Sequence, residues 1–219
     1  MAEIKACIFD LDGVVVDTAR YHFQAWNMLA KELGIHFTEE DNEQLKGVSR
    51  MASLEVILKI GDQQYDDENK MEMAERKNRW YKELISQMQP GEILPGVVPF
   101  LDELREHGIR LAIGSASKNA PTILLRVGVI DYFDAVIDGN VTTYAKPHPE
   151  TFLNAAHALG VDPVNCVVFE DAFSGIQAAR SGDMRVIGVG SKDVLGEADY
   201  VIDSFAEMDL KKLLSIYAK

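Results

Sequence analysis

The chain has 219 residues, a formal net charge of −13 and an apolar content of 47%, which is ordinary for a globular protein. This length allows one large domain, or a core domain with a second one inserted into it. The acidic balance disfavours a nucleic-acid partner, and the absence of a bilayer-length apolar stretch or a signal region predicts a cytoplasmic protein with no membrane partner.

The first predicted element is a buried strand over Ile4–Phe9, which ends at the tetrad Asp10-Leu11-Asp12-Gly13. From Asp17 the pattern becomes helical, with apolar residues recurring every three or four positions until Gly34 ends the helix. No convincing strand lies between residues 17 and 88. Three further helices are predicted there, over Glu39–Lys46, Met51–Ile60 and Asn69–Met88.

After Pro95 the pattern alternates between helix and strand. This alternation predicts a parallel sheet covered by helices on both faces. The two cysteines, Cys7 and Cys166, lie in apolar strand-like runs and are expected to be reduced core residues. The predicted helices are Val97–His107, Pro121–Val127, Pro149–Leu159, Gly175–Ser181 and Leu210–Tyr217, and the strands are Arg110–Ser115, Ala135–Asp138, Cys166–Phe169, Arg185–Val189 and a short one at Val201.

The all-helical block therefore looks like an insertion after the first strand. The predicted fold is α/β, a Rossmann-like parallel sheet core with an inserted all-helical cap domain. We assign residues 1–16 and 92–219 to the core and residues 17–91 to the cap. The connections at residues 14–17 and 89–95 would form the hinge, and the cleft between the two parts is the expected ligand site.

Polar residues follow four of the predicted strands. Because the carboxyl ends of parallel strands share one edge of a sheet, these residues would meet there if the strands are neighbours. A divalent Mg²⁺ ion prefers hard oxygen ligands, and a lysine can offset the negative charge of a phosphoryl group in transfer. The residues are Asp10 and Asp12, Ser115, Lys146, and the pair Glu170-Asp171.

Each of these pieces also has an ordinary structural interpretation. An Asp-x-Asp-Gly tetrad is often a turn, Ser115–Asn119 can begin a helix, and Glu170-Asp171 can be a solvated strand end. The conjunction of all four, in order and each at a strand terminus, favours a phosphoryl-transfer site.

This conjunction resembles the four motifs of the haloacid dehalogenase superfamily, over almost the whole chain and with a helical cap after the first motif. The resemblance implies that Asp10 is the nucleophile that becomes phosphorylated. It implies that Asp12 is the general acid and base and that its backbone carbonyl also binds Mg²⁺. Ser115 and Lys146 would complete the catalytic set, and Glu170 and Asp171 the metal site.

A narrower resemblance lies in the cap and in the segment Ser115–Asn119. The segments 17–22, 45–50 and 76–78 are similar to those of the β-phosphoglucomutase family, whose members interconvert β-glucose 1-phosphate and glucose 6-phosphate through β-glucose 1,6-bisphosphate. By this resemblance the substrate-binding residues are Thr18, His22, Gly47, Val48, Ser49, Arg50, Lys77, Ala116, Ser117, Lys118 and Asn119.

The physical chemistry of the cap agrees with this assignment. Arg50 offers a planar fork for the phosphate that is not reacting, and Gly47–Ser49 can supply backbone N–H groups. Thr18 and His22 lie one helical turn apart and so face the same way. The alternatives are a surface cation for Arg50 and a core or hinge hydrogen bond for His22. For Lys77, as for His22, the sequence favours neither a functional nor a structural role. His36, His107, His148 and His157 are expected at the surface, and none is given a role.

The sequence thus predicts a Mg²⁺-dependent sugar-phosphate mutase that acts as a monomer. A sugar-phosphate phosphatase of the same superfamily is the first alternative, because the core motifs are compatible with both activities. A non-catalytic sensor of phosphorylated metabolites is the second, because a fold alone does not guarantee a function.

Overall fold

A computed structural model describes residues 3–45 and 48–217 of the chain. In this part of the chain one parallel sheet has six strands, in the order β3-β2-β1-β4-β5-β6. The strands are β1 (Ala6–Phe9), β2 (Arg110–Gly114), β3 (Ala135–Ile137), β4 (Cys166–Glu170), β5 (Arg185–Val189) and β6 (Tyr200–Ile202).

Helices cover both faces of this sheet. On one side α5 (Val97–Glu106), α6 (Ala120–Val127) and α10 (Leu210–Tyr217) pack against a cluster that includes Cys7 and Phe9. On the other side α7 (Glu150–Leu159), α8 (Phe173–Ser181) and the short α9 (Lys192–Leu195) pack against a cluster that includes Ala6 and Ile8. Alternate residues of β1 thus face opposite layers, as expected for a strand buried on both faces.

The strand β1 occupies the centre of the sheet, between β2 and β4. Phe9 is paired with Ile113 on one side and with Phe169 on the other. Its ring also stacks on that of Phe169, with the centroids 4.8 Å apart. The strands β2, β1 and β4 are therefore direct neighbours, and β3, which precedes Lys146 in the chain, lies on the far side of β2. All four strands that precede polar motifs are adjacent, which was the condition for their side chains to meet.

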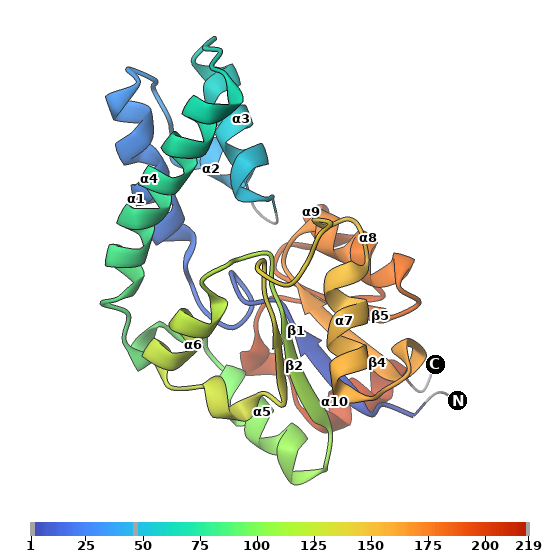
Figure 1. Cartoon of the computed structure of the whole chain (residues 1–219). Coiled ribbons are helices and arrows are strands. Elements are labelled where there is room, and N and C mark those ends of the chain that lie inside the picture. Colours follow the sequence, from blue (N-terminus) through green and yellow to red (C-terminus); the bar gives the residue numbers. More distant parts are fainter. Residues whose placement is uncertain (1–2, 46–47, 218–219) are drawn as a thin grey trace.

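Four of the helices that lie between β1 and β2 in the described chain stand apart from the helices that cover the sheet. They are α1 (Ala19–Glu32), α2 (Glu39–Glu43), α3 (Arg50–Ile60) and α4 (Asp67–Ile85), and they stand beyond the carboxyl ends of the strands (Figure 1). They have an apolar core of their own, which includes Trp26, Leu29, Leu54 and Ile57. We continue to propose residues 17–91 as the cap domain.

The two predicted hinge connections lie side by side. Val16 forms a β-bridge with Ile93, and the amide of Leu94 donates to the carbonyl of Val15 at 3.0 Å. The carboxylate of Glu92 accepts hydrogen bonds from Arg20 and Tyr21 at the start of α1. These contacts tie the entry and exit of the helical block together at a single place.

The predicted parallel sheet, with helices on both faces and a helical insertion, is confirmed. Element bounds differ by a few residues: α4 begins before Asn69 and ends at Ile85, and α2 ends at Glu43. Both cysteines are buried and free, and His36, His107, His148 and His157 are exposed. Among the described residues, no helix is both long and apolar enough to cross a membrane.

Candidate active site

The centre of the candidate site is Asp10, directly after β1. Its backbone amide donates to the carbonyl of Phe169 at 2.9 Å, so the sheet ladder fixes where the side chain leaves the strand. Its Oδ2 accepts the backbone N–H of Asp12, also at 2.9 Å. The Asp-Leu-Asp-Gly tetrad thus does form a turn, but one in which the first carboxylate is held by the third residue's amide.

Gly13 is required for this turn. Its φ of +84° is in the left-handed region, where residues with a Cβ are strained. A Cβ at this position would also collide with the carboxylate of Asp171. The glycine therefore lets the loop after β1 approach the end of β4.

Lys146 joins two carboxylates beneath the site. Its Nζ donates to Oδ1 of Asp10 at 2.5 Å and to Oε2 of Glu170 at 2.8 Å, and its side chain is 1% exposed. Burial alone would lower the pKa of Lys146, but the two carboxylates outweigh it and raise that pKa, so the lysine stays charged. Burial also raises the pKa of Glu170, while the ammonium of Lys146 opposes the rise.

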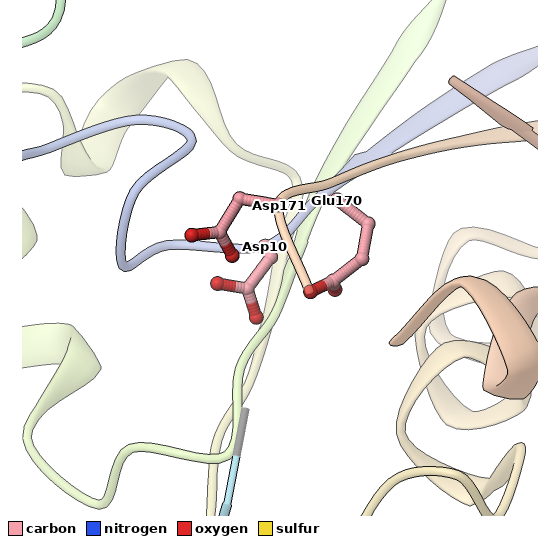
Figure 2. Close-up of side chains that lie close together, drawn as sticks. All are labelled: Asp10, Glu170 and Asp171. Atoms are coloured by element: carbon pink, nitrogen blue, oxygen red, sulfur yellow. The ribbon is translucent and has the colours of Figure 1, made fainter. Parts of the chain in front are cut away.

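Three carboxylates converge at the ends of β1 and β4. Asp10, Glu170 and Asp171 each offer an oxygen that lies within 4.8 Å of the other two (Figure 2). The second oxygen of Glu170 accepts the backbone N–H of Ala172 at 3.0 Å. Gly175 leaves room for Glu170, because a Cβ there would overlap its carboxylate. A set of hard oxygen donors with a few positions left for water and phosphate suits Mg²⁺.

Asp12 lies next to this group but faces the hinge. Its Oδ1 accepts a hydrogen bond from the hydroxyl of the buried Thr18, which precedes α1. Removal from water, followed by the negative charge of Asp10, raises the pKa of Asp12 to about 6. A carboxyl group with such a pKa exchanges its proton readily near neutral pH.

Ser115 follows β2 on the other side of Asp10. Its side chain is buried, and its Oγ accepts the backbone N–H of Ser117 at 3.0 Å. Asn119 is also buried, Ala116 and Ser117 are partly exposed, and Lys118 is exposed. The predicted helix start is displaced slightly, because α6 begins at Ala120 with Asn119 before it.

The cap contributes a second group of polar side chains. Lys77 of α4 is 3% exposed, and its Nζ lies 3.0 Å from Nδ1 of His22 on α1. The ammonium also lies over the rings of Trp26 and Tyr81, at 4.4 and 4.6 Å from their centroids. Burial, followed by the charge of Arg50, lowers the pKa of Lys77 to about 7. Burial, then Lys77 and Arg50, holds the pKa of His22 well below its usual value, so the imidazole is neutral.

Arg50 is the first residue of α3 and is partly exposed. Its guanidinium forms an ion pair with Glu75 of α4 at 2.6 Å. The preceding residue, Ser49, caps this helix by accepting the backbone N–H of Ala52. Val48 comes just before, and Gly47 lies outside the described residues.

The structure thus places the predicted residues in two groups. Asp10, Asp12, Ser115, Lys146, Glu170 and Asp171 gather at the sheet edge, as the neighbouring strands required. His22, Lys77 and Arg50 gather in the cap, and Thr18 links the groups through Asp12. The catalytic, binding and metal roles of these residues stay predictions.

Three contacts at the site were not expected from the sequence. Glu75 pairs with Arg50, and the ring of Tyr81 packs at a tilt against that of His22, with centroids 4.2 Å apart. Asn78 accepts a hydrogen bond from the side-chain amide of Asn119 at 3.1 Å, which joins α4 to the loop after β2. Only Asn78 lay in a segment singled out in the sequence. The other two occupy ordinary helical positions, whose contacts depend on how α1, α3 and α4 pack.

Comparison with known proteins agrees with this geometry. A relative from Bacillus subtilis (strain 168), a β-phosphoglucomutase, is 43% identical over 96% of this chain and 94% of its own. The crystal structure of a β-phosphoglucomutase from Clostridium difficile covers 98% of this chain and 97% of its own, with a TM-score of 0.94 and 42% identity. A phosphorylated carbohydrates phosphatase from Thermotoga maritima is 32% identical over 85% of both chains.

A family model for haloacid dehalogenase-like hydrolases matches residues 4–183, which include both groups of site residues. The match covers most of the chain and agrees with the parallel sheet, the strand-end motifs and the relatives above. The chain belongs to the haloacid dehalogenase-like hydrolase family.

Proposed function

We propose that the protein is a sugar-phosphate mutase that interconverts β-D-glucose 1-phosphate and D-glucose 6-phosphate through a phospho-aspartyl enzyme and β-glucose 1,6-bisphosphate. The observation that carries this proposal is the presence of two separate cationic groups, Lys146 at the sheet edge and Arg50 with Lys77 in the cap. Two β-phosphoglucomutases at 42–43% identity support the choice of substrate.

The transfer site is the sheet edge. The carboxylate of Asp10 is the nucleophile, and Lys146 holds it in place while offsetting the charge of an approaching phosphoryl group. Ser115, buried beside it, can donate its hydroxyl proton to a phosphoryl oxygen. Without such positive charge a carboxylate and a phosphate dianion a few Å apart repel by several kcal/mol, at an effective dielectric of about 20.

The donor set at this edge fits Mg²⁺. Asp10 and Asp171 would hold the ion, with Glu170 beside them and the backbone carbonyl of Asp12 as a further ligand. When bound, Mg²⁺ supplies positive charge that stabilises the negative charge on the transferring phosphoryl group. The ligand set and the choice of Mg²⁺ are part of this proposal.

Asp12 moves the proton. When the phosphoryl group passes from Asp10 to a sugar hydroxyl, Asp12 accepts the proton of that hydroxyl. When the other phosphate of the bisphosphate passes to Asp10, Asp12 returns a proton to the leaving oxygen. Thr18 holds the carboxyl group of Asp12 toward the hinge, so cap movement would release it into the cleft.

The cap holds the idle phosphate. Arg50 provides a bidentate fork, and Lys77 and His22 line the neighbouring wall. Closing the cap over the substrate excludes the water that would otherwise hydrolyse phosphorylated Asp10. The monomeric state, the cytoplasmic location and the absence of nucleic-acid and membrane partners stay predictions.

A coupled assay tests the reaction directly. Enzyme supplied with β-glucose 1-phosphate, Mg²⁺ and a trace of the bisphosphate should form glucose 6-phosphate, measured with glucose-6-phosphate dehydrogenase. A second candidate is a phosphatase, because a carbohydrate phosphatase is 32% identical over 85% of the chain. Release of inorganic phosphate without glucose 6-phosphate would favour that candidate and reject the mutase.

Replacing Arg50 separates the two candidates further. Arg50→Ala should lower kcat/KM of the mutase reaction by about 10- to 150-fold, since a charge-assisted contact contributes about 1.5–3 kcal/mol. Arg76→Ala is the matched control, because Arg76 also lies in the cap but pairs with Glu32 and Glu72. Equal activity of Arg50→Ala and wild type would contradict a phosphate-holding role for Arg50.

A further inference from the structure

Arg50 is already engaged by a carboxylate of the same chain. Its Nη1 lies 2.6 Å from Oε1 of Glu75, which makes one of the shortest ion pairs in the described part of the cap. The Arg50 side chain is 20% exposed, whereas that of Glu75 is 60% exposed. The carboxylate of Glu75 is therefore the more exposed partner of the pair, and water can compete with it for the guanidinium.

The position of Glu75 places it beside the proposed phosphate site. Glu75 lies two residues before Lys77 on α4, and Arg50 begins the neighbouring helix α3. The charge of Arg50 is felt by both Lys77 and His22, so all three belong to one group of side chains. Within this group the hydrogen-bond partner of Lys77 is a neutral imidazole, and the partner of Arg50 is Glu75.

We propose that Glu75 is a resident anion that occupies Arg50 in the open enzyme and must be displaced by the substrate phosphate, so that it sets the affinity of the cap for phosphorylated sugars. This inference rests on the proposed role of Arg50 in holding the idle phosphate. Glu75 then lowers the affinity of the cap for phosphorylated sugars, whereas Arg50 raises it by binding the phosphate.

Charge and geometry make the exchange possible. A carboxylate offers the guanidinium of Arg50 one negative charge and two oxygens. A phosphate monoester offers it up to two negative charges and three terminal oxygens. An exposed ion pair contributes little free energy, because water competes for both groups and the side chains lose freedom. Glu75 therefore occupies Arg50 without preventing a phosphate dianion from replacing it.

The effect of Glu75 on binding has a defined sign. If the ion pair has to break when the phosphate binds, removing the negative charge of Glu75 must tighten binding. If Glu75 only holds Arg50 in a productive rotamer, the same change must weaken it. The two roles are therefore separated by the direction of a measured Kd.

Isothermal titration calorimetry with glucose 6-phosphate as the probe tests the proposal. Glu75→Gln should bind the probe about two- to fivefold more tightly than the wild type, the range expected for an exposed ion pair. Glu72→Gln is the matched control, because Glu72 lies on the same helix but pairs with Arg76. Its Kd should equal that of the wild type.

A double-mutant cycle ties the effect to Arg50. In an Arg50→Ala background, Glu75→Gln should no longer tighten binding, because the competing pair has already been removed. The gain from Glu75→Gln in the otherwise native protein should shrink as salt increases, since ions screen an exposed pair. In steady-state assays the variant should lower KM without raising kcat, as expected for a change in ground-state binding.

Two results would overturn the inference while leaving the proposed function in place. In the first, Glu75→Gln binds glucose 6-phosphate no more tightly than the wild type, although Arg50→Ala still weakens binding. In the second, Glu75→Gln tightens binding in the Arg50→Ala background as much as it does in the native protein. A different pattern, in which Arg50→Ala itself leaves the Kd and the mutase activity unchanged, would reject the role of Arg50 and with it the inference.

Discussion

At the sheet edge, Lys146 donates to two buried carboxylates at 2.5 and 2.8 Å, whereas in the cap Lys77 donates to the neutral ring of His22. Both lysines are almost fully buried, yet the pKa of Lys146 is raised and that of Lys77 is lowered to about 7. The partner of each ammonium therefore decides its charge more than its depth does.

This difference has a functional meaning. At the sheet edge Lys146 already pairs with Asp10 and Glu170 before any ligand arrives, so the carboxylate of Asp10 is held in a fixed position. The cap holds cationic groups whose charge is only partly balanced by Glu75, and an arriving phosphate completes the balance. In the proposed function, the sheet edge carries out the phosphoryl transfer, and the cap captures an anion and releases it again.

The largest expected effect is at the sheet edge. Lys146→Met should lower the free energy of unfolding by about 3–5 kcal/mol near pH 8 without Mg²⁺, because it leaves Asp10 and Glu170 buried without their counter-ion. Turnover should fall by about 10²- to 10³-fold, as for the loss of one preorganised group at the reacting centre. Urea unfolding and the coupled assay measure the two effects.

The pH dependence of the Lys146→Met defect provides a check. Burial already raises the pKa of Glu170, and its unpaired carboxylate is costly only when ionised, so the loss of stability should shrink as the pH falls and Glu170 becomes protonated. A loss that stays constant between pH 8 and pH 5 would mean that lost packing, rather than uncompensated charge, is the cause.

The same replacement in the cap, Lys77→Met, should change the free energy of unfolding in the opposite direction. Between pH 7 and about 10.5 Lys77 is neutral in the folded protein but charged in the unfolded chain, so the wild-type free energy of unfolding rises with pH across this window. Lys77→Met removes this dependence and should raise the free energy of unfolding at pH 7, by about 1–3 kcal/mol after the lost contact with His22 is allowed for.

Urea unfolding of both proteins at several pH values measures this difference. The gain of Lys77→Met over the wild type should fall steadily from pH 7, and near pH 10.5 it should become a small loss, because only the missing contact with His22 then remains. Below pH 7, where most of Lys77 is charged, the variant should still bind glucose 6-phosphate more weakly than the wild type, because the cap has lost a cationic donor. A variant that is less stable than the wild type at pH 7 would show that the His22 contact outweighs the burial of the amine.

Much of the sheet edge could be predicted from the sequence, because it depends on local pattern. Asp10, Ser115 and Glu170 each follow an apolar run, and a parallel sheet brings the ends of neighbouring strands together. The sequence motifs did not show that Lys146 bridges Asp10 and Glu170, because separation along the sequence does not give distance in space. The strand order supplied that information.

The cap was harder to predict, because its contacts depend on how helices pack. Lys77 and His22 are 55 positions apart, and Arg50 and Glu75 are 25 positions apart. No periodicity relates one helix to another, so the resemblance to a family of mutases identified Arg50 and Lys77 but not Glu75. The helix α2 begins at Glu39 as predicted, after the cap Thr38, and only its end differs. The start of α4 moved by two residues, because the capping side chain of Asp66 decides where this helix begins.

The last prediction concerns the link between the two regions. Asn119 follows Ser115 in the loop after β2, and its side-chain amide donates to Asn78 on α4 at 3.1 Å, with both residues buried. Asn78→Ala should lower the free energy of unfolding by about 1–3 kcal/mol, because it leaves a buried donor without its acceptor. The nearby exposed residue Arg79 provides a control, and Arg79→Ala should change stability by less than about 0.5 kcal/mol.

The kinetics of Asn78→Ala distinguish a link from a simple packing contact. If the amide pair couples α4 to the loop after β2, its loss should change kcat and KM together, as expected for a residue that controls closure. Asn78→Asp keeps the acceptor for Asn119, so it should recover more of the kinetics than of the stability, because it buries a new charge. If Asn78→Ala lost stability while kcat and KM stayed at wild-type values, the hydrogen bond would serve the fold alone, and the two cationic sites would work without this connection.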